Sequence, residues 1–392
     1  MESQFLIEKL KTIETPYYYY DVDLLTNTLN KINSLIANKS VQVHYAIKAN
    51  FNKKLLSIIS SKGFGADCVS KGEIQEALEN GFPSSKILFA GVGKTDKEIK
   101  YAIDHDIYCF NVESVPELEV INQLAKEKGK IVNISFRVNP NIQAHTHAKI
   151  TTGLNENKFG IALRDIYNII ELVCEKNKTY QNVKFIGLHF HIGSQILDLH
   201  DFLPLCSLIN EMNEKLRAKQ IYPTFIDVGG GLGIDYESPN SHPIPNFEEY
   251  FATYLEHIKL YPGQVLHCEL GRAIVAQCGS LISQVTYIKE GQTKKFAILD
   301  AGMTELIRPA MYGAVHQIEK IKDSNDIVNK REKYDVVGPI CESSDVFAKG
   351  VEIEVLKRGD LVAIRSAGAY GESMASNYNC RGIVKGYLST EL

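Results

Sequence analysis

The sequence predicts a (β/α)8 barrel joined to a β domain. Through about residue 270, short apolar runs alternate with segments of helical periodicity, which is the pattern of such a barrel. Beyond that point apolar runs continue, but their connections are rich in Gly, Pro and charged residues. We therefore expect the barrel at residues 21–270 and the β domain, sandwich-like or barrel-like, at residues 1–20 and 271–392. The alternative for the first part is an open, doubly wound parallel sheet.

Eight apolar runs predict the barrel strands. They are residues 41–47, 65–69, 86–90, 107–111, 131–138, 183–190, 223–228 and 264–268. Helical periodicity fills the segments between them, and Ser70, Thr95 and Ser114 stand where helix caps are expected. A further helix is predicted over residues 21–37, before the first strand.

The β domain is predicted from four apolar runs after residue 270, at 280–288, 296–300, 334–337 and 361–365. The tyrosine-rich segment 15–20 is also typical of a strand. We expect this N-terminal segment to join the C-terminal β domain.

Composition excludes several classes of partner. With 43 Lys and Arg against 47 Asp and Glu, the net charge is -4, which argues against nucleic acid or an anionic membrane as the main partner. No apolar run reaches the roughly 18 residues of a membrane span, and no signal-peptide pattern opens the chain. The eight cysteines form no Cys-x-x-Cys pair. A cytoplasmic location without disulfides is therefore expected.

Candidate catalytic residues lie at the carboxyl ends of the predicted strands, where barrel enzymes place them. Lys48 ends the first apolar run. A buried ammonium group is costly unless it is used, so Lys48 is either a Schiff-base lysine deprotonated by burial or a surface lysine with a buried stem. His189 lies at the end of the sixth predicted strand and His191 directly after it, and alternation points both to the same side. They either line the barrel mouth or form a metal site with His145 and His147.

The seventh and eighth strands end in groups that suit an aromatic phosphate. Glycines at 229, 230, 231 and 233 let backbone N–H groups approach a phosphate closely, although their spacing is not that of a dinucleotide-binding loop. Glu269 suits a cationic ring nitrogen, and Arg272 suits a phosphate. A lysine, a histidine, a phosphate loop and a carboxylate together describe a pyridoxal 5'-phosphate site.

Seven segments carry a resemblance to a known family. They are residues 44–50, 187–195, the glycine run, 300–303, 307–312, 338–343 and 368–370. Over about residues 15–385 the chain resembles the barrel-type pyridoxal 5'-phosphate-dependent amino-acid decarboxylases. Within them it is most similar to the members that convert meso-2,6-diaminopimelate to L-lysine and CO2, the last step of lysine biosynthesis.

The resemblance implies a role for each matching residue. Lys48 would bind the cofactor covalently, His191 would stack on the pyridine ring, and Glu269 would keep the ring nitrogen protonated. The phosphate and ring would be surrounded by Ser194, Gly229, Gly230, Gly231, Gly271, Arg272 and Tyr370. The substrate would be bound by Arg272, Arg308, Tyr312, Tyr370 and Glu342, the last meeting its distal ammonium group. Cys341 would be the proton donor. In the family, the residues matching Cys341 and Glu342 come from the partner subunit, which implies a homodimer with shared active sites.

One motif departs from the family, and several alternatives stay open. The usual Glu-Pro-Gly-Arg is here Glu269-Leu270-Gly271-Arg272, which frees one φ angle and adds one N–H group. The chain could instead decarboxylate another diamino acid or a carboxylated polyamine, be an inactive relative that only binds partners, or be a metal-dependent hydrolase. Arg308 near Tyr312 offers a fork for a second carboxylate, which favours diaminopimelate. No metal is expected.

Overall fold

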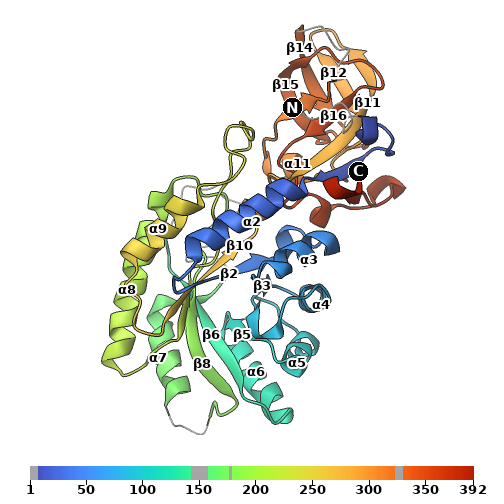
Figure 1. Ribbon diagram of the computed structural model, residues 1–392. Coiled ribbons are helices and arrows are strands. Elements are labelled where there is room, and N and C mark those ends of the chain that lie inside the picture. The colour runs from blue at the N-terminus through green and yellow to red at the C-terminus, as the bar shows by residue number, and fades with distance from the viewer. Residues whose placement is uncertain (1–7, 143–157, 176–178, 323–329) are drawn as a thin grey trace. The chain divides into compact units, whose positions relative to one another are not determined.

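The structure is a computed structural model that describes residues 8–142, 158–175, 179–322 and 330–392 (Figure 1). It divides into two compact units. The barrel unit comprises Leu29–Gly233 and Asn246–Gly271, and the β unit comprises Met1–Thr28, Ile234–Pro245 and Arg272–Leu392, as far as these ranges are described. The division falls between Gly271 and Arg272, so Glu269 and Arg272 belong to different units.

The barrel unit contains a closed ring of eight parallel strands. They are β2 (Val41–Ala46), β3 (Gly65–Cys68), β4 (Ile87–Phe89), β5 (Cys109–Val112), β6 (Val132–Asn139), β8 (Val183–His189), β9 (Phe225–Asp227) and β10 (Val265–Leu270). Pairing of β5 with β6 and of β10 with β2 closes the ring. The predicted barrel is therefore confirmed, and the open sheet is excluded. The two-residue β7 (Ile161–Ala162) pairs with β6 outside the ring.

Helices connect the barrel strands and lie on the outside of the ring (Figure 1). They are α3 (Lys53–Ser61), α4 (Lys71–Glu79), α5 (Asp96–Asp104), α6 (Val115–Glu127), α7 (Leu163–Cys174), α8 (Leu203–Ala218) and α9 (Phe247–His257). The caps predicted at Ser70, Thr95 and Ser114 are confirmed, since each side chain accepts a hydrogen bond from a backbone N–H three residues on. The helix predicted over 21–37 is α2 (Val22–Ile36).

Side chains inside the barrel change from apolar to polar along the strands. Nearer the amino ends, Leu88, Cys109, Ile186 and Phe225 pack in one apolar cluster. At the carboxyl ends the buried side chains are polar: Asp67, Asn111, His189, Asp227 and Glu269. Buried polar groups are costly unless they are paired or used, so this end of the barrel is the candidate site.

The β unit is built on one mixed sheet of eight described strands. They are β1 (Tyr17–Tyr20), β11 (Gly279–Glu290), β12 (Lys295–Leu299), β13 (Ile318–Lys320), β14 (Arg331–Val337), β15 (Val346–Glu354), β16 (Leu361–Ile364) and β17 (Lys385–Leu388). The long β11 pairs with β1, β12 and β16, so the N-terminal tyrosine segment joins this sheet as predicted. The unit also holds the short helices α10 (Arg272–Val275) and α11 (Arg308–Tyr312).

Three strands of the β unit were not predicted. β13 and β17 have three and four residues, too few for a clear apolar pattern. In β15 only Phe347 and Ile353 are buried, and Gly350 has a φ of 62°. A strand with only two buried residues and a left-handed glycine in its middle has no continuous apolar run to reveal it.

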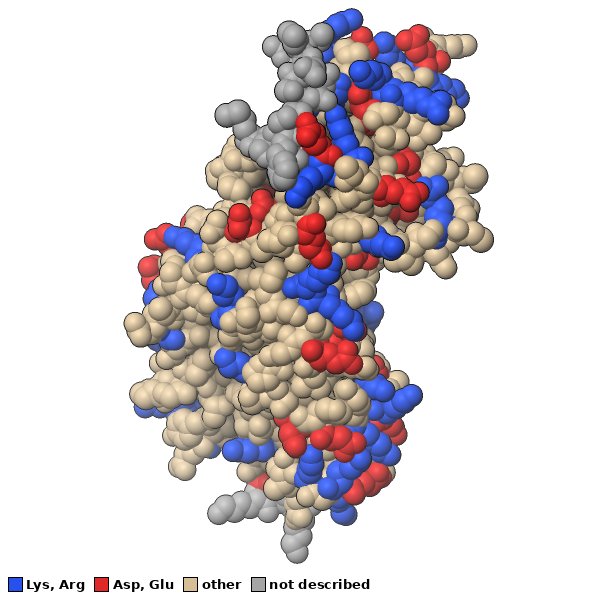
Figure 2. All heavy atoms as spheres, turned by 45° about the vertical axis from the view of Figure 1, so that its right-hand side comes forward, with Lys and Arg blue, Asp and Glu red and all other residues tan. Residues whose placement is uncertain are grey.

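The surface agrees with the balanced charge of the sequence. On the face shown in Figure 2, Lys and Arg side chains are interspersed with Asp and Glu. This face therefore presents no broad field of one sign. Within the described ranges, no helix combines the length and the apolarity needed to cross a membrane.

Candidate active site

Lys48 lies in the short 3-10 turn η1 (Ile47–Ala49) directly after β2. Its Nζ donates to Oδ2 of Asp67 over 3.0 Å, and the Lys48 side chain is 42% exposed while that of Asp67 is fully buried. The Lys48 side chain is therefore not buried, and the burial expected to deprotonate it is replaced by an ion pair, which favours the charged amine. Burial and the charge of Glu269 raise the pKa of Asp67, and Lys48 opposes them. Asp67 was not predicted, although a charged residue inside the apolar run 65–69 was a usable signal.

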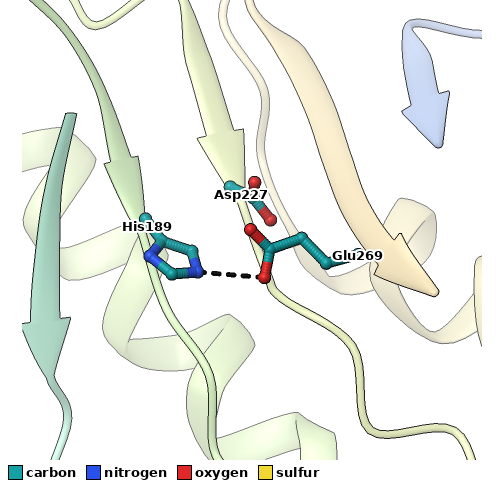
Figure 3. A group of neighbouring side chains, drawn as sticks. All are labelled: His189, Asp227 and Glu269. Carbon is teal, nitrogen blue, oxygen red and sulfur yellow. Dashed lines mark hydrogen bonds and ion pairs between the residues drawn. The ribbon is translucent and has the colours of Figure 1, made fainter. Parts of the chain in front are cut away.

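Glu269 lies inside the barrel beside His189 and Asp227 (Figure 3). Asn111 donates to its Oε1 over 3.3 Å, and His189 Nε2 lies 3.2 Å from its Oε2. Burial works against ionisation, but His189 and Lys48 hold the pKa of Glu269 well below its usual range. The neighbouring Asp227 differs, since burial and the charge of Glu269 raise its pKa. The sequence missed Asn111, whose amide lies in the apolar run of β5.

His191 and the glycine run meet after β8 and β9. The N–H of Gly230 donates to Nδ1 of His191 over 3.2 Å, so this nitrogen carries a lone pair. Removal from water, then the positive charges of Arg137 and Lys48, lower the pKa of His191 to about 3, which keeps the imidazole neutral. A Cβ on Gly230 would lie 2.2 Å from the backbone oxygen of Glu269, so only glycine fits.

The remaining predicted residues of the barrel unit lie in loops at the same end. Ser194 follows β8 and is partly buried. Gly271 follows β10, and a Cβ there would lie 2.9 Å from Cβ of Ala49. The carboxyl ends of β2, β8, β9 and β10 thus bring together Lys48, His191, Ser194, Gly229, Gly230, Gly231, Glu269 and Gly271. Leu270, which replaces the family proline, is the last residue of β10 and pairs with Tyr45.

The β unit contains a second cluster of predicted residues, arranged around Tyr236. Arg272 Nη1 donates to the Tyr236 hydroxyl over 2.6 Å, and its Cζ lies 4.9 Å from the Tyr370 ring centroid. The Arg308 Cζ lies 4.7 Å from the centroid of the Tyr236 ring. Tyr312 lies one turn beyond Arg308 on α11, on the same side of the helix. The sequence missed Tyr236, which carries no local signal of this role.

Cys341 and Glu342 are exposed residues of the β unit. The Tyr378 hydroxyl donates to Oε1 of Glu342 over 2.8 Å, and the N–H of Cys341 donates to the Asn379 side chain over 3.3 Å. In the described part of the chain, no hydrogen bond or ion pair joins Cys341 or Glu342 to the cluster around Tyr236. Their contacts inside the β unit therefore neither support nor exclude the predicted roles of Cys341 as proton donor and Glu342 as substrate ligand.

The described residues contain one group with the spacing of a metal site. The ligand atoms of His189, Asp227 and Glu269 lie within 4.8 Å of one another (Figure 3). However, His189 is bonded to Glu269, and the raised pKa of Asp227 favours its protonated form, which is a poor ligand. His191 accepts a hydrogen bond from Gly230 and is not part of this group. His145 and His147 lie outside the described residues. The geometry favours a hydrogen-bonded network over the metal-dependent hydrolase.

Comparison with known proteins decides the family. The family model described as pyridoxal-dependent decarboxylase, pyridoxal binding domain, matches residues 23–276. The diaminopimelate decarboxylase of Bacteroides thetaiotaomicron is 58% identical over 393 residues, covering 100% of both chains. This chain belongs to the diaminopimelate decarboxylase family. A crystal structure of diaminopimelate decarboxylase from Helicobacter pylori, complexed with L-lysine, matches with a TM-score of 0.90 and 39% identity. That match covers 98% of this chain and 94% of the other.

The barrel unit fits the pyridoxal 5'-phosphate that this family uses. Lys48 offers an amine to an aldehyde, and the neutral His191 offers a face for an aromatic ring. Glu269 is an ionised carboxylate that suits a protonated ring nitrogen. Three buried polar atoms at this site form no hydrogen bond among the described residues, and a bound group could supply it. They are Oδ1 of Asp67, Nδ1 of His189 and Oδ2 of Asp227. With these groups in place, the inactive relative is not supported, and the chain is a pyridoxal-dependent carboxy-lyase.

Proposed function

We propose that this chain decarboxylates meso-2,6-diaminopimelate to L-lysine and CO2. The observation that carries the proposal is the group at the barrel end, with Lys48 paired to Asp67 and an ionised Glu269, in a chain 58% identical to a diaminopimelate decarboxylase along its full length. The reaction breaks the bond between Cα and one carboxylate, releases CO2, and places a proton on Cα. The chemistry that pyridoxal 5'-phosphate supplies when bound is an electron sink for the pair left on Cα.

The barrel residues have distinct tasks in this proposal. Lys48 attaches the cofactor, and Asp67 keeps the Lys48 amine at the mouth of the barrel. His191, whose pKa is lowered to about 3, would cover one face of the ring. Glu269, whose two oxygens are held by Asn111 and His189, would keep the ring nitrogen protonated. The phosphate and the ring edge would be bound by Ser194, Gly229, Gly230, Gly231 and Gly271, together with Arg272 and Tyr370 of the β unit.

The β unit supplies the residues that recognise the substrate. Arg308 and Tyr312, with Arg272 and Tyr370, bind the carboxylate groups, and Glu342 binds the distal ammonium group. The Cys341 thiol donates the proton to Cα. A substrate without a second carboxylate, such as ornithine, is less well supported, because Arg308 is a buried cation with no carboxylate partner among the described residues.

We further propose a homodimer in the cytoplasm. Cys341 and Glu342 serve the active site of the partner subunit, so two shared sites are related by a two-fold axis. All eight cysteines are free, which agrees with a reducing compartment.

The function is tested with purified protein, meso-2,6-diaminopimelate and pyridoxal 5'-phosphate, by measuring L-lysine and CO2. We expect equal amounts of L-lysine and CO2 from meso-2,6-diaminopimelate. L-Ornithine at the same concentration should give no CO2. The Lys48→Ala variant should be inactive, whereas Lys53→Ala, which removes an exposed lysine of α3, should match the parent. Borohydride reduction followed by peptide mass analysis should mark Lys48. Absence of lysine, or a label on another residue, would contradict the proposal.

A further inference from the structure

Arg308 is a buried cation held by neutral groups. Only 6% of the residue is exposed, and within the described ranges no carboxylate lies within ion-pair distance of its guanidinium. Burial and the charge of Arg272 disfavour the ionised form, and lower the pKa of Arg308. A buried charge without a counter-ion is costly, and persists where function requires it. The groups that hold this guanidinium therefore matter as much as the arginine itself.

His316 holds one edge of the Arg308 guanidinium. Nδ1 of His316 lies 2.8 Å from the backbone oxygen of Arg365, and a carbonyl can only accept, so this nitrogen carries the proton. Nε2 therefore keeps a lone pair, and accepts from Nη1 of Arg308 over 2.8 Å. His316 is 3% exposed. The Arg365 carbonyl thus selects the one neutral tautomer that can bind an arginine.

Tyr236 holds the face of the same guanidinium. Its ring packs under Arg308, and also meets the His316 ring edge-on, at 5.0 Å between centroids and 75° between planes. Its hydroxyl accepts from Arg272, and its backbone oxygen accepts from the N–H of Gln317, the residue after His316. One tyrosine therefore fixes the positions of both arginines.

We propose that His316 and Tyr236 are positioning residues that make the enzyme specific for a substrate with a carboxylate at its distal end. They keep the Arg308 guanidinium charged, oriented and without an anionic partner of its own, so that a substrate carboxylate completes its hydrogen bonds. This inference rests on the proposed function, in which the distal amino-acid group is the part that remains in the product L-lysine. An acidic residue in place of His316 would pair with Arg308 and occupy the site instead.

The test compares two ligands that differ only in the distal carboxylate. The cofactor-loaded parent, His316→Phe and His316→Gln are titrated with L-lysine and with 1,5-diaminopentane by calorimetry. Phe keeps the ring that packs on Tyr236 but removes the acceptor, whereas Gln can accept from Arg308 and donate to the Arg365 carbonyl. We expect His316→Phe to weaken lysine binding about 10- to 100-fold, the range for losing a hydrogen bond to a charged group. Binding of diaminopentane should stay within about threefold of the parent, and Gln should restore most of the lysine affinity.

Turnover gives a second readout. In His316→Phe, KM for diaminopimelate should rise by the same factor as the lysine dissociation constant, with kcat within a few-fold of the parent. If His316→Phe weakens lysine and diaminopentane binding equally, so that the ratio of their dissociation constants is unchanged, the role is structural and the proposal is overturned. A parent that binds both ligands equally would overturn it as well. Failure of the proposed function is seen separately, as a parent that forms no lysine from diaminopimelate.

Discussion

Two buried carboxyl groups of the barrel, Glu269 and Asp227, have pKa values shifted in opposite directions because their neighbours differ. Glu269 receives hydrogen bonds on both oxygens, from Asn111 and His189. Asp227 receives one from the N–H of Gly229, and faces the negative charge of Glu269. The pKa of Glu269 is therefore lowered by its partners, whereas burial and the charge of Glu269 raise that of Asp227.

We predict that Glu269→Gln retains the cofactor but lowers kcat about 10²- to 10³-fold, the usual effect of removing one preorganised electrostatic contact. The amide cannot hold a proton on the ring nitrogen. The control is Asp227→Asn, which replaces the carboxyl group whose pKa is raised and keeps an oxygen for the Gly229 N–H. Its kcat should stay within a few-fold of the parent. Steady-state kinetics with cofactor content measured by absorbance decide between the two roles, and equal losses in both variants would refute the assignment.

Position along a predicted strand was enough to find Lys48, His191 and Glu269, because the carboxyl ends of barrel strands share one face. It did not reveal Asn111 or His316. Their partners lie across the barrel or far along the chain: Asn111 meets a residue 158 positions away, and His316 a carbonyl 49 positions away. Such pairings depend on tertiary structure, and no local pattern encodes them.

Among the elements, the loop after β9 packs closely against its neighbours at the candidate site. Gly230 does not need a left-handed backbone, but its α-carbon faces the backbone oxygen of Glu269 at the end of β10. Gly229 and Gly231 have φ angles of 72° and 116°, so they need glycine for conformational reasons as well. Close packing of this loop is what places Gly230 against His191.

A methyl group at position 230 should therefore push the loop away from β10. We predict that Gly230→Ala lowers the free energy of unfolding by about 1–3 kcal/mol, as overpacking does, and weakens cofactor binding. The matched control is Gly93→Ala, where an added Cβ meets nothing within 4 Å and the backbone needs no positive φ. That variant should stay within about 0.5 kcal/mol of the parent. Thermal and urea unfolding with cofactor titration provide the comparison, and identical behaviour of the two variants would argue against the packing account.

Strands β2 and β10 also share a pair of buried histidines below the site. His44 Nδ1 lies 3.1 Å from the Lys86 carbonyl and so carries the proton, which leaves Nε2 to accept from His267 Nδ1 over 3.2 Å. The His267 ring stacks on Phe225 at 4.5 Å. Burial lowers the pKa of His44 to about 4 and that of His267 well below its usual value, so the folded protein holds both rings neutral.

This pair should make the protein sensitive to acid. The unfolded histidines titrate near pH 6.5, so below that pH the unfolded chain takes up protons that the native state refuses. The stabilisation is complete above about pH 6.5, and is lost as the pH falls toward 4. We predict that His267→Phe, which keeps a ring on Phe225, loses about 1–2 kcal/mol less stability between pH 7 and pH 5 than the parent. Urea unfolding at both pH values measures this difference. Parallel losses would mean that His267 already titrates normally in the folded protein.

At the scale of the whole molecule, the sequence pattern predicted a barrel followed by a β domain, because apolar periodicity reports strand and helix alternation directly. It did not indicate that residues 234–245 group with the β unit. That assignment depends on Tyr236, which packs with Arg272 and Arg308 and whose backbone bonds to Gln317. Short edge strands such as β13 and β17 were missed for the complementary reason, since they contribute too few buried side chains.

The proposed shared sites lead to a test on the intact assembly. Lys48 belongs to the barrel unit, and Cys341 belongs to the β unit, where it is exposed. If each site combines Lys48 of one subunit with Cys341 of the other, Lys48→Ala and Cys341→Ala should each be nearly inactive alone. A mixed dimer would then contain one site in which both residues are intact and one in which both are lost.

Mixing equal amounts of the two variants and allowing subunits to exchange should therefore restore activity. Random exchange makes about half of the dimers mixed, and each mixed dimer has one good site of two, so about a quarter of the parental activity is the upper limit. Native mass spectrometry establishes that exchange has taken place, and cofactor absorbance establishes that the Cys341→Ala subunits remain loaded. A mixture of Lys48→Ala with the double variant Lys48→Ala, Cys341→Ala is the control, because no arrangement of those chains rebuilds a complete site. If exchange is complete and activity stays at the level of the single variants, Cys341 acts on the site of its own chain, and the shared-site dimer is wrong.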